Sequence, residues 1–294
     1  MNYLLLFFIG LIWGAQFVLI DFSLSIYTPE QLALFRTLYA ALFLIVFCVL
    51  TKRKRHTRSM IVWLKVIVIG VLEIVIPFTL VMWGQQFVSG SMASILMGTI
   101  PFFTIILILL TGIERATATK FIAMMVGFIG LIVLFIPDLI KYGMSLAILP
   151  ELAILVGALS FASALIIIRS LSHEDSFLLS RDAFFIGTII MFAINLGNGS
   201  LNQLSFSFYP FIASLLLGIF CSGIVYVLYV SLIKRAGVGF CSLSNYLVPL
   251  FGSILGVIIM NDHITLNMIL ACVLILLSIT IEPLIRFWCG KIRC

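Results

Sequence analysis

The chain has 294 residues, of which 63% are hydrophobic and only 10% charged, with a formal net charge of +6. Soluble domains are roughly 45–50% apolar and about 25% charged, so this composition excludes a water-soluble fold. A transmembrane helix needs about 20 mostly apolar residues, and the length accommodates ten such helices with short loops. We therefore expect an all-α integral membrane protein.

Apolar runs bounded by charged residues, Pro, Gly or Asn predict ten transmembrane spans. In chain order they cover residues 3–20, 32–50, 61–83, 89–111, 119–136, 147–168, 178–196, 209–232, 239–260 and 264–285. The first run lacks the basic start and small-residue cleavage site of a signal peptide, so we interpret it as the first span.

Charge placement predicts the orientation of the spans. With a cytoplasmic N-terminus, the inner loops hold 15 of the 17 Lys and Arg residues, namely Lys52, Arg53, Lys54, Arg55, Arg58, Lys65, Arg115, Lys120, Arg169, Arg181, Lys234, Arg235, Arg286, Lys291 and Arg293. Lys141 then lies in an outer loop and Arg36 within the second span. The positive-inside rule therefore places both termini in the cytoplasm, and the net charge requires no nucleic-acid partner.

The two halves of the sequence resemble each other at an offset of 148 residues. Pro101 then falls on Pro249, and Glu114 falls on the acidic residue Asp262. Residues 1–140 form one predicted repeat, and residues 141–294, with a short basic tail, form the other. Because each repeat has an odd number of spans, the second is inverted in the membrane, as in alternating-access transporters with a site near the midplane.

The two prolines lie near the middle of spans four and nine. Each removes a backbone donor and frees a carbonyl group, which favours a role for Pro101 and Pro249 in gating or solute binding. A packing kink is the simpler alternative.

Motifs in both halves together resemble one known family, the ten-helix EamA-type transporters of the drug/metabolite transporter superfamily. In chain order the motifs are Trp13-Gly14 with Phe17, Pro29, Arg36, Ala93 to Pro101, Glu114, Gly127 with Gly130, Ser160-Phe161-Ala162, Tyr229, Ser242 to Pro249, and Asp262. The sequence departs from the family pattern at Asp262, where Glu is usual, at Phe161, where Trp is frequent, and at Ala271 and Ser278, where glycines are expected.

The resemblance implies a bacterial inner-membrane carrier for amino acids, related metabolites or drugs, often an exporter. It also implies a central cavity lined by spans one, three, four, six, eight and nine. The uncharged candidates on these spans are Trp13, Gln16, Met97, Ser160, Tyr226, Tyr229, Asn245 and Tyr246. An interfacial aromatic belt is the alternative for a Trp or Tyr near a span end.

Glu73 is the most informative single residue, because it lies about 12 residues into a 23-residue span and so near the midplane. An ionised side chain there costs several kcal/mol and usually faces a cavity or a partner, so Glu73 is a candidate for proton coupling or for binding a substrate ammonium group. A protonated Glu bonded to a neighbouring helix is the alternative. Arg36, the second coupling candidate, can reach Glu73, a substrate carboxylate or, by snorkelling, the lipid headgroups.

The sequence contains no HExxH, GxSxG or P-loop pattern, and its six cysteines show no CxxC pair. An enzyme, a cofactor and a metal site are therefore not expected. We expect a secondary transporter for a small organic solute, with export as the favoured direction, the proton as candidate coupling ion, and a monomer or homodimer embedded in lipid. The alternatives are a lipid scramblase or flippase, and a carrier for metabolite uptake or exchange.

Overall fold

A computed structural model describes residues 1–53, 57–88, 90–115, 117–142, 148–260, 266–267, 269–270 and 273–281. Every regular element in these ranges is helical, which confirms the all-α fold class. Seven helices among the described residues are long and apolar enough to cross a membrane, namely Asn2–Leu24, Pro29–Leu50, Met60–Gly84, Met92–Thr111, Leu149–Ser170, Ser176–Gly197 and Phe208–Ala236. Ala118–Gly130 and Val238–Gly252 are shorter apolar helices.

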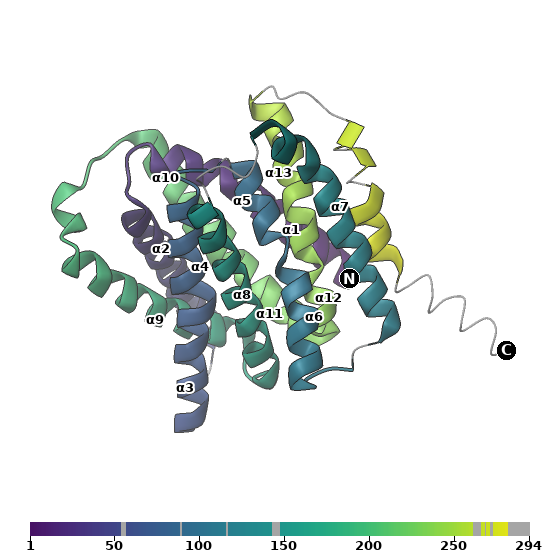
Figure 1. Ribbon diagram of the computed structural model, residues 1–294. Helices are drawn as coiled ribbons and strands as arrows, with labels where there is room; N and C mark the ends of the chain where they lie inside the picture. The colour runs from purple at the N-terminus through teal and green to yellow at the C-terminus, as the bar shows by residue number, and fades with distance from the viewer. Residues whose placement is uncertain are drawn as a thin grey trace.

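The elements follow the first nine predicted spans in order (Figure 1). The first half holds α1 (Asn2–Leu24), α2 (Pro29–Leu50), α3 (Met60–Ile69), the π-helical turn η1 (Gly70–Val75), α4 (Ile76–Gly84), α5 (Gly90–Met97), α6 (Ile100–Thr111) and α7 (Ala118–Tyr142). The second half holds α8 (Ile148–Ser170), α9 (Ser176–Gly197), the 3-10 turn η2 (Ser200–Gln203), α10 (Phe208–Gly218), the π-helical turn η3 (Ile219–Ile224), α11 (Val225–Ala236), α12 (Val238–Ser242) and α13 (Ser244–Met260). Residues 273–281 are also helical, and the rest of the predicted tenth span lies mostly outside the described residues.

Several helix boundaries differ from the predicted spans by a few residues, and two of these differences concern α2 and α7. Helix α2 begins at Pro29 instead of residue 32, because Thr28 Oγ1 accepts a hydrogen bond from the Gln31 N–H while the Gln31 side chain accepts one from the Thr28 N–H. This capping box, with proline in the first turn, starts a helix efficiently. Helix α7 extends past the predicted residue 136 to Tyr142, so Lys141 lies at a helix end.

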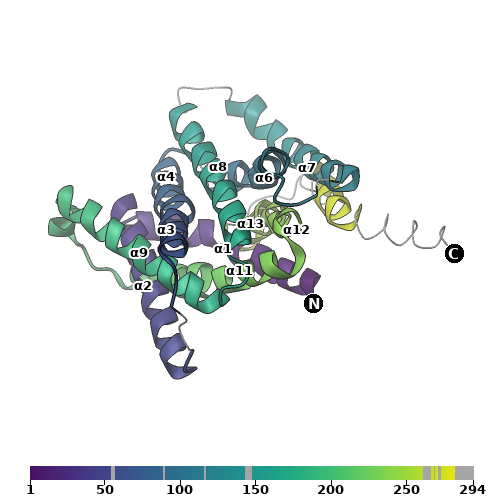
Figure 2. The same cartoon turned by 90° about the horizontal axis from the view of Figure 1, so that it is seen from below.

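The helices form a bundle with two distinct ends. We call the end formed by residues 51–53, 57–59, 112–115, 117 and 171–175 and by Gly237 the basic end; it lies toward the bottom of Figure 1 and faces the viewer in Figure 2. The N-terminus is near this end, because Arg235 Nη1 lies 3.6 Å from Met1 Sδ. The other end is called the opposite end. Helices α2 and α9 pack together on one side of the bundle, and α7 lies beside residues 273–281 on the other side (Figures 1 and 2).

The centre of the bundle depends on close packing between the two halves. Helix α1 packs along α13, and a Cβ atom added at Gly10 or Gly14 would lie only 2.4 Å from Leu247 Cβ or 2.6 Å from Phe251 Cβ. These two glycines are four residues apart and therefore lie on one face of α1. Small residues at this spacing let membrane helices approach closely, since lipid supplies no hydrophobic driving force for their association.

Replacing Gly14 with Ala is expected to lower stability by about 1–3 kcal/mol, the usual cost of overpacking a core. Thermal unfolding of the purified protein in detergent measures the change. Gly197→Ala is the matched control, because a Cβ atom there meets nothing within 4 Å. Equal melting temperatures for the two variants would show that α1 and α13 can separate without cost.

Candidate solute-binding site

A cavity lies within the bundle, with about 600 Å³ of empty space that includes its open side. It is lined by Trp13, Gln16, Phe17, Arg36, Glu73, Pro77, Phe78, Val81, Met82, Met97, Phe161, Phe184, Cys221, Ser222, Tyr226, Asn245 and Val248. These residues come from both halves of the chain. The lining is mostly apolar and aromatic, with a few polar groups and one residue of each charge.

The cavity extends from the middle of the bundle toward the opposite end. Val81 and Met82, in its wall, lie within a turn of the end of α4. Toward the basic end, the rings of Trp13, Phe161 and Tyr229 contact one another, with centroids 4.6–5.7 Å apart. All three residues are buried, so these rings form an aromatic floor that separates the cavity from the basic end.

Two backbone irregularities shape the walls. In η1 the Ile76 N–H bonds to Val71 O, five residues back, so the next donor in that pattern would be residue 77. Residue 77 is proline and has no N–H, which leaves Leu72 O without that partner. Ser160 Oγ, on α8, donates to Leu72 O at 2.7 Å. A side chain of the second half thus satisfies a carbonyl of the first half.

The turn η3 repeats this arrangement in the second half, with its bounds 149 residues after those of η1. The Val225 N–H bonds to Phe220 O instead of Cys221 O. Cys221 O accepts hydrogen bonds from Trp13 Nε1 at 3.1 Å and from Arg36 Nη2 at 3.0 Å. Single π-helical turns inside α-helices frequently mark functional sites.

Arg36 is buried, with 3% of its surface exposed. Its Nε donates to Ser222 Oγ at 2.6 Å, its Nη2 donates to Gln16 Oε1 at 2.8 Å, and its guanidinium lies 3.9 Å above the centre of the Phe78 ring. All these partners are neutral, and Arg36 forms no ion pair with any described residue. The side chain therefore borders the cavity with an uncompensated positive charge, and snorkelling does not describe its place here.

Glu73 has no surface accessible to solvent. Tyr226 OH donates to its Oε2 at 2.6 Å, whereas its Oε1 is buried without a hydrogen-bond partner. Like Arg36, it forms no ion pair among the described residues. A solute that contacts Glu73 must therefore displace or move a neighbouring side chain, and Tyr226 is the hydrogen-bonded neighbour on that path.

The structure brings most of the candidates together. Trp13, Gln16, Arg36, Glu73, Met97, Tyr226 and Asn245 line the cavity. Tyr229 lies in the aromatic floor, and Asn245 Nδ2 donates to its hydroxyl at 3.3 Å. Ser160 acts on the wall through Leu72 O. Tyr246 is outside the cavity lining, because its hydroxyl donates to Met124 O at 2.6 Å and its ring packs on Gly127.

The two prolines lie in different local structures. Pro101 is the second residue of α6, directly after the break at residues 98–99 between α5 and α6. Pro249 lies inside α13, which is separated from α12 by Leu243. Neither proline lines the cavity, so a gating role for Pro101 and Pro249 remains a proposal.

Sequence reasoning missed Pro77, Phe78, Phe184, Cys221 and Ser222. Pro77 and Phe78 follow Glu73 by about one helical turn. Residues at this spacing lie on the same face of a helix, so the sequence could have predicted them to line the cavity beside Glu73. Ser222 corresponds to Glu73 at an offset of 149, one residue more than the proline match indicates.

Comparisons with known proteins agree with this architecture. The model of the EamA-like transporter family matches residues 1–136 and again residues 148–281. An uncharacterized transporter of Archaeoglobus fulgidus is 26% identical over 89% of this chain and 90% of its own length. The uncharacterized transporter YoaV of Bacillus subtilis is 23% identical over 91% of each chain. A solved crystal structure has a TM-score of 0.78 at 17% identity, covering 97% of this chain and 96% of its own, which shows the shared fold.

The chain belongs to the EamA-like transporter family of the drug/metabolite transporter superfamily. The ten-helix repeat fold of that family confirms the predicted fold class. The protein is a multi-pass membrane transporter for small solutes, and both its family and its relatives are named as transporters.

The hydrogen bond between Tyr226 and Glu73 yields a test of the site's internal connections. Tyr226→Phe leaves both carboxyl oxygens of Glu73 without a partner, at an expected cost of about 1–3 kcal/mol. In a Glu73→Met background the same change should cost less, because no carboxyl group remains. A double-mutant cycle from unfolding in mixed detergent measures the difference. Additive effects would show that the two side chains are not coupled.

Proposed function

We propose that the protein is a secondary transporter for a zwitterionic small organic solute of the amino-acid class, working by alternating access. The observation that carries the proposal is the pair of charged residues in one cavity, Arg36 and Glu73, neither of which has an ion-pair partner among the described residues. An uncompensated Arg or Glu inside a membrane costs several kcal/mol, so such residues usually serve a pathway or a ligand.

The chemistry of the two residues complements a zwitterion. A guanidinium group suits a carboxylate, and Arg36 Nη1 makes none of the hydrogen bonds described above. A carboxylate at Glu73 suits an ammonium group. The rings of Phe78, Phe184 and Tyr226 line the same cavity, which favours a solute with an apolar side chain. Amphipathic amines, including cationic drugs, would use the Glu73 side of the cavity alone.

Glu73 is also the group we propose for proton coupling. Its carboxyl group is buried in this conformation, so the neutral form is the less costly one in the absence of an ammonium group. Glu73 would then release its proton when an ammonium group binds, which would couple the transport of the solute to the transport of a proton. The inverted repeats supply the alternating access, with Pro101 and Pro249 as candidate gating positions.

Orientation and direction follow from charge placement and from the position of the cavity. We propose that the basic end, with both termini, lies in the cytoplasm of a bacterial inner membrane. The cavity then lies between the aromatic floor and the non-cytoplasmic end of the bundle. This conformation corresponds to the stage at which an exported solute leaves the protein. The monomer, or a homodimer in lipid, is the proposed functional unit.

Competition between solute analogues tests the two binding roles in proteoliposomes. For a labelled apolar amino acid, the free amino acid should compete about 10–100-fold better than its methyl ester or its N-acetyl derivative, because each derivative loses a charge-assisted contact of about 1.5–3 kcal/mol. In Arg36→Gln the advantage over the methyl ester should vanish, whereas the advantage over the N-acetyl form should persist. Arg36→Lys, which keeps the charge, should retain both preferences.

Arg53→Gln is the matched control, since Arg53 lies at the basic end and its pair with Asp175 is about one-third exposed. Unchanged discrimination in a folded Arg36→Gln variant would remove Arg36 from solute recognition.

The pH dependence of transport tests the coupling role of Glu73. Transport by the unaltered protein should respond to an imposed pH gradient, and Glu73→Gln, which cannot release a proton, should give a rate insensitive to that gradient. Counterflow at equal pH serves as the control for binding. A Glu73→Gln variant with the same gradient response as the unaltered protein would exclude Glu73 as the coupling group.

The same vesicles test the second candidate function, a lipid scramblase. Flipping of fluorescent phospholipid in the absence of any solute transport would favour that function over a solute carrier.

A further inference from the structure

The ion pairs of the described residues are distributed unevenly in the bundle. All of them lie at the basic end, where Arg53 pairs with Asp175, Arg58 with Glu174 and Asp182, Glu114 with Lys120 and Arg169, and Arg181 with Asp182. His173 adds a pair with Glu174 when its imidazole is protonated. The cavity lies on the other side of the aromatic floor. The basic end is thus closed by charge pairs as well as by packing in this conformation.

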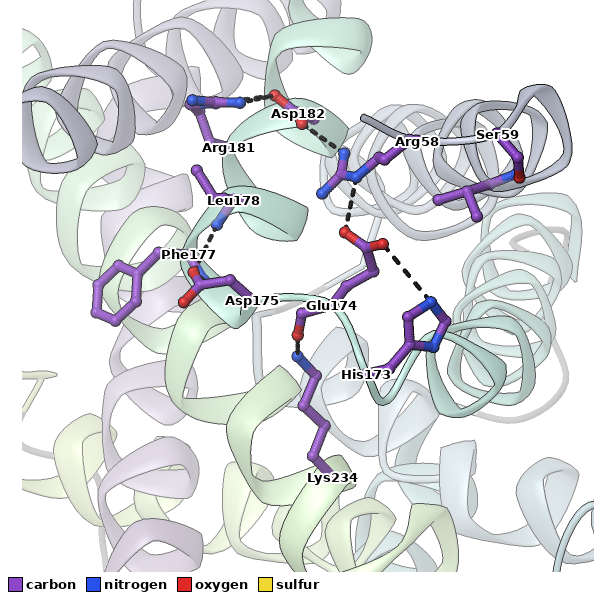
Figure 3. A network of polar contacts seen from close by, with 11 residues as sticks. Arg58, Ser59, His173, Glu174, Asp175, Phe177, Leu178, Arg181, Asp182 and Lys234 are labelled. Carbon is purple, nitrogen blue, oxygen red and sulfur yellow. Dashed lines mark hydrogen bonds and ion pairs between the residues drawn. The ribbon is translucent and has the colours of Figure 1, made fainter. Parts of the chain in front are cut away.

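Glu174 connects the basic ends of the two spans that contain π-helical turns (Figure 3). Its Oε2 accepts from Nε of Arg58, which lies two residues before α3, at 2.7 Å. Its backbone carbonyl accepts from Nζ of Lys234, near the end of α11. Arg58 also donates from Nη1 to Asp182 Oδ2 at 2.5 Å. We call Arg58, Glu174, Asp182 and Lys234 the clasp.

Arg58 in the clasp is buried yet incompletely satisfied, whereas the side chains of Glu174 and Asp182 are 17% and 9% exposed. The Arg58 side chain is 3% exposed, and its Nη2 is buried without a hydrogen-bond partner. Because the desolvation of buried ions largely offsets their attraction, such a network contributes little net stability compared with hydrated charges. Opening would expose Nη2 and the paired carboxylates to water. These properties suit a contact that forms and breaks repeatedly better than a permanent structural bond.

The opposite end has no charged counterpart of the clasp in the sequence. At the offset of 149 residues that relates the two π-helical turns, the positions matching Arg58, Glu174, Asp182 and Lys234 are occupied by the uncharged residues Ser207, Ser25, Ala33 and Gln85. The two repeats therefore differ at their ends, although their π-helical turns correspond. Charge changes in the clasp should then affect only the state in which the basic end is closed.

We propose that the clasp is the gate at the basic end, which opens to admit solute from that side. The proposal rests on the alternating access of the proposed function. The turns η1 and η3 lie between the clasp and the opposite ends of their spans, and each lacks the regular α-helical hydrogen bonding at mid-depth. They are the points at which the basic ends of the two spans can move apart while the opposite ends approach each other.

A reversible cross-link tests the gate in proteoliposomes. The double variant Arg58→Cys/Glu174→Cys is bridged with a short bis-methanethiosulfonate reagent, and mass spectrometry confirms the bridge. Solute exchange should fall to background and return on reduction with dithiothreitol, while the solute still raises the melting temperature, since the cavity is reached from the opposite end. The single variants treated with the same reagent control for modification alone.

Arg53→Cys/Asp175→Cys is the matched pair. Arg53 adjoins α2 and Asp175 caps α9, two helices that pack along each other and contain no π-helical turn, so this bridge should leave exchange unchanged. Full exchange by the bridged Arg58→Cys/Glu174→Cys protein would overturn the proposal.

A second measurement does not depend on transport. Hydrogen–deuterium exchange of the start of α3 and the end of α11 should be at least several-fold faster in Arg58→Gln than in the unaltered protein or Arg53→Gln, and Arg58→Lys should fall between. The melting temperature of each variant verifies that it is folded. Equal exchange in a folded Arg58→Gln would contradict the gate even if no solute tested is transported, whereas faster exchange without transport would count only against the proposed function.

Discussion

Two carbonyl groups at mid-depth organise this protein. In hydrocarbon a backbone carbonyl without a helical partner costs several kcal/mol, so it must accept from elsewhere in the chain. Leu72 O accepts from Ser160, and Cys221 O accepts from Trp13 and Arg36. Each irregular turn thus ties one half of the protein to the other, and the second turn also holds the charged residue that we assign to the solute. The two π-helical turns therefore shape both the wall of the cavity and the chemistry of the site.

The backbone is nearly symmetric between the halves, whereas the side chains are not. The π-helical turns correspond at an offset of 149 residues, yet Glu73 in one matches Ser222 in the other. The serine accepts from Arg36, and the glutamate accepts from Tyr226. One turn therefore fixes the cation Arg36, and the other places an acid in the same cavity. The two matched positions thus differ, because Glu73 is itself charged whereas Ser222 holds a charged residue of α2.

Charge has separate uses in the two parts of the bundle. At the basic end Arg58 is paired with Glu174 and Asp182, and these two carboxylates largely offset the cost of burying its charge. In the cavity Arg36 and Glu73 have neutral partners only, so their charges remain available to a ligand. The distinction follows from position, since a gate must satisfy its charges when closed and a site must satisfy them when occupied.

The sequence alone determined the membrane location, the first nine spans and the paired halves, and it identified Glu73 as an acidic residue near mid-span. Each depends on local composition or on spacing along the chain, such as the apolar run around Glu73 or the match of Pro101 with Pro249. The start of α2 was also encoded locally, in the capping box at Thr28, although it was not recognised.

Only the tertiary structure decided which side chains meet. It turned Arg36 into the cavity, where Ser222 and Gln16 hold it, and it placed Tyr246 against α7 instead of in the cavity. It also showed that Pro77 leaves Leu72 O free for Ser160. These outcomes depend on the packing of spans distant in the sequence. Because both the lipid-facing and the inward faces of a membrane helix are apolar, periodicity cannot tell in advance which face turns inward.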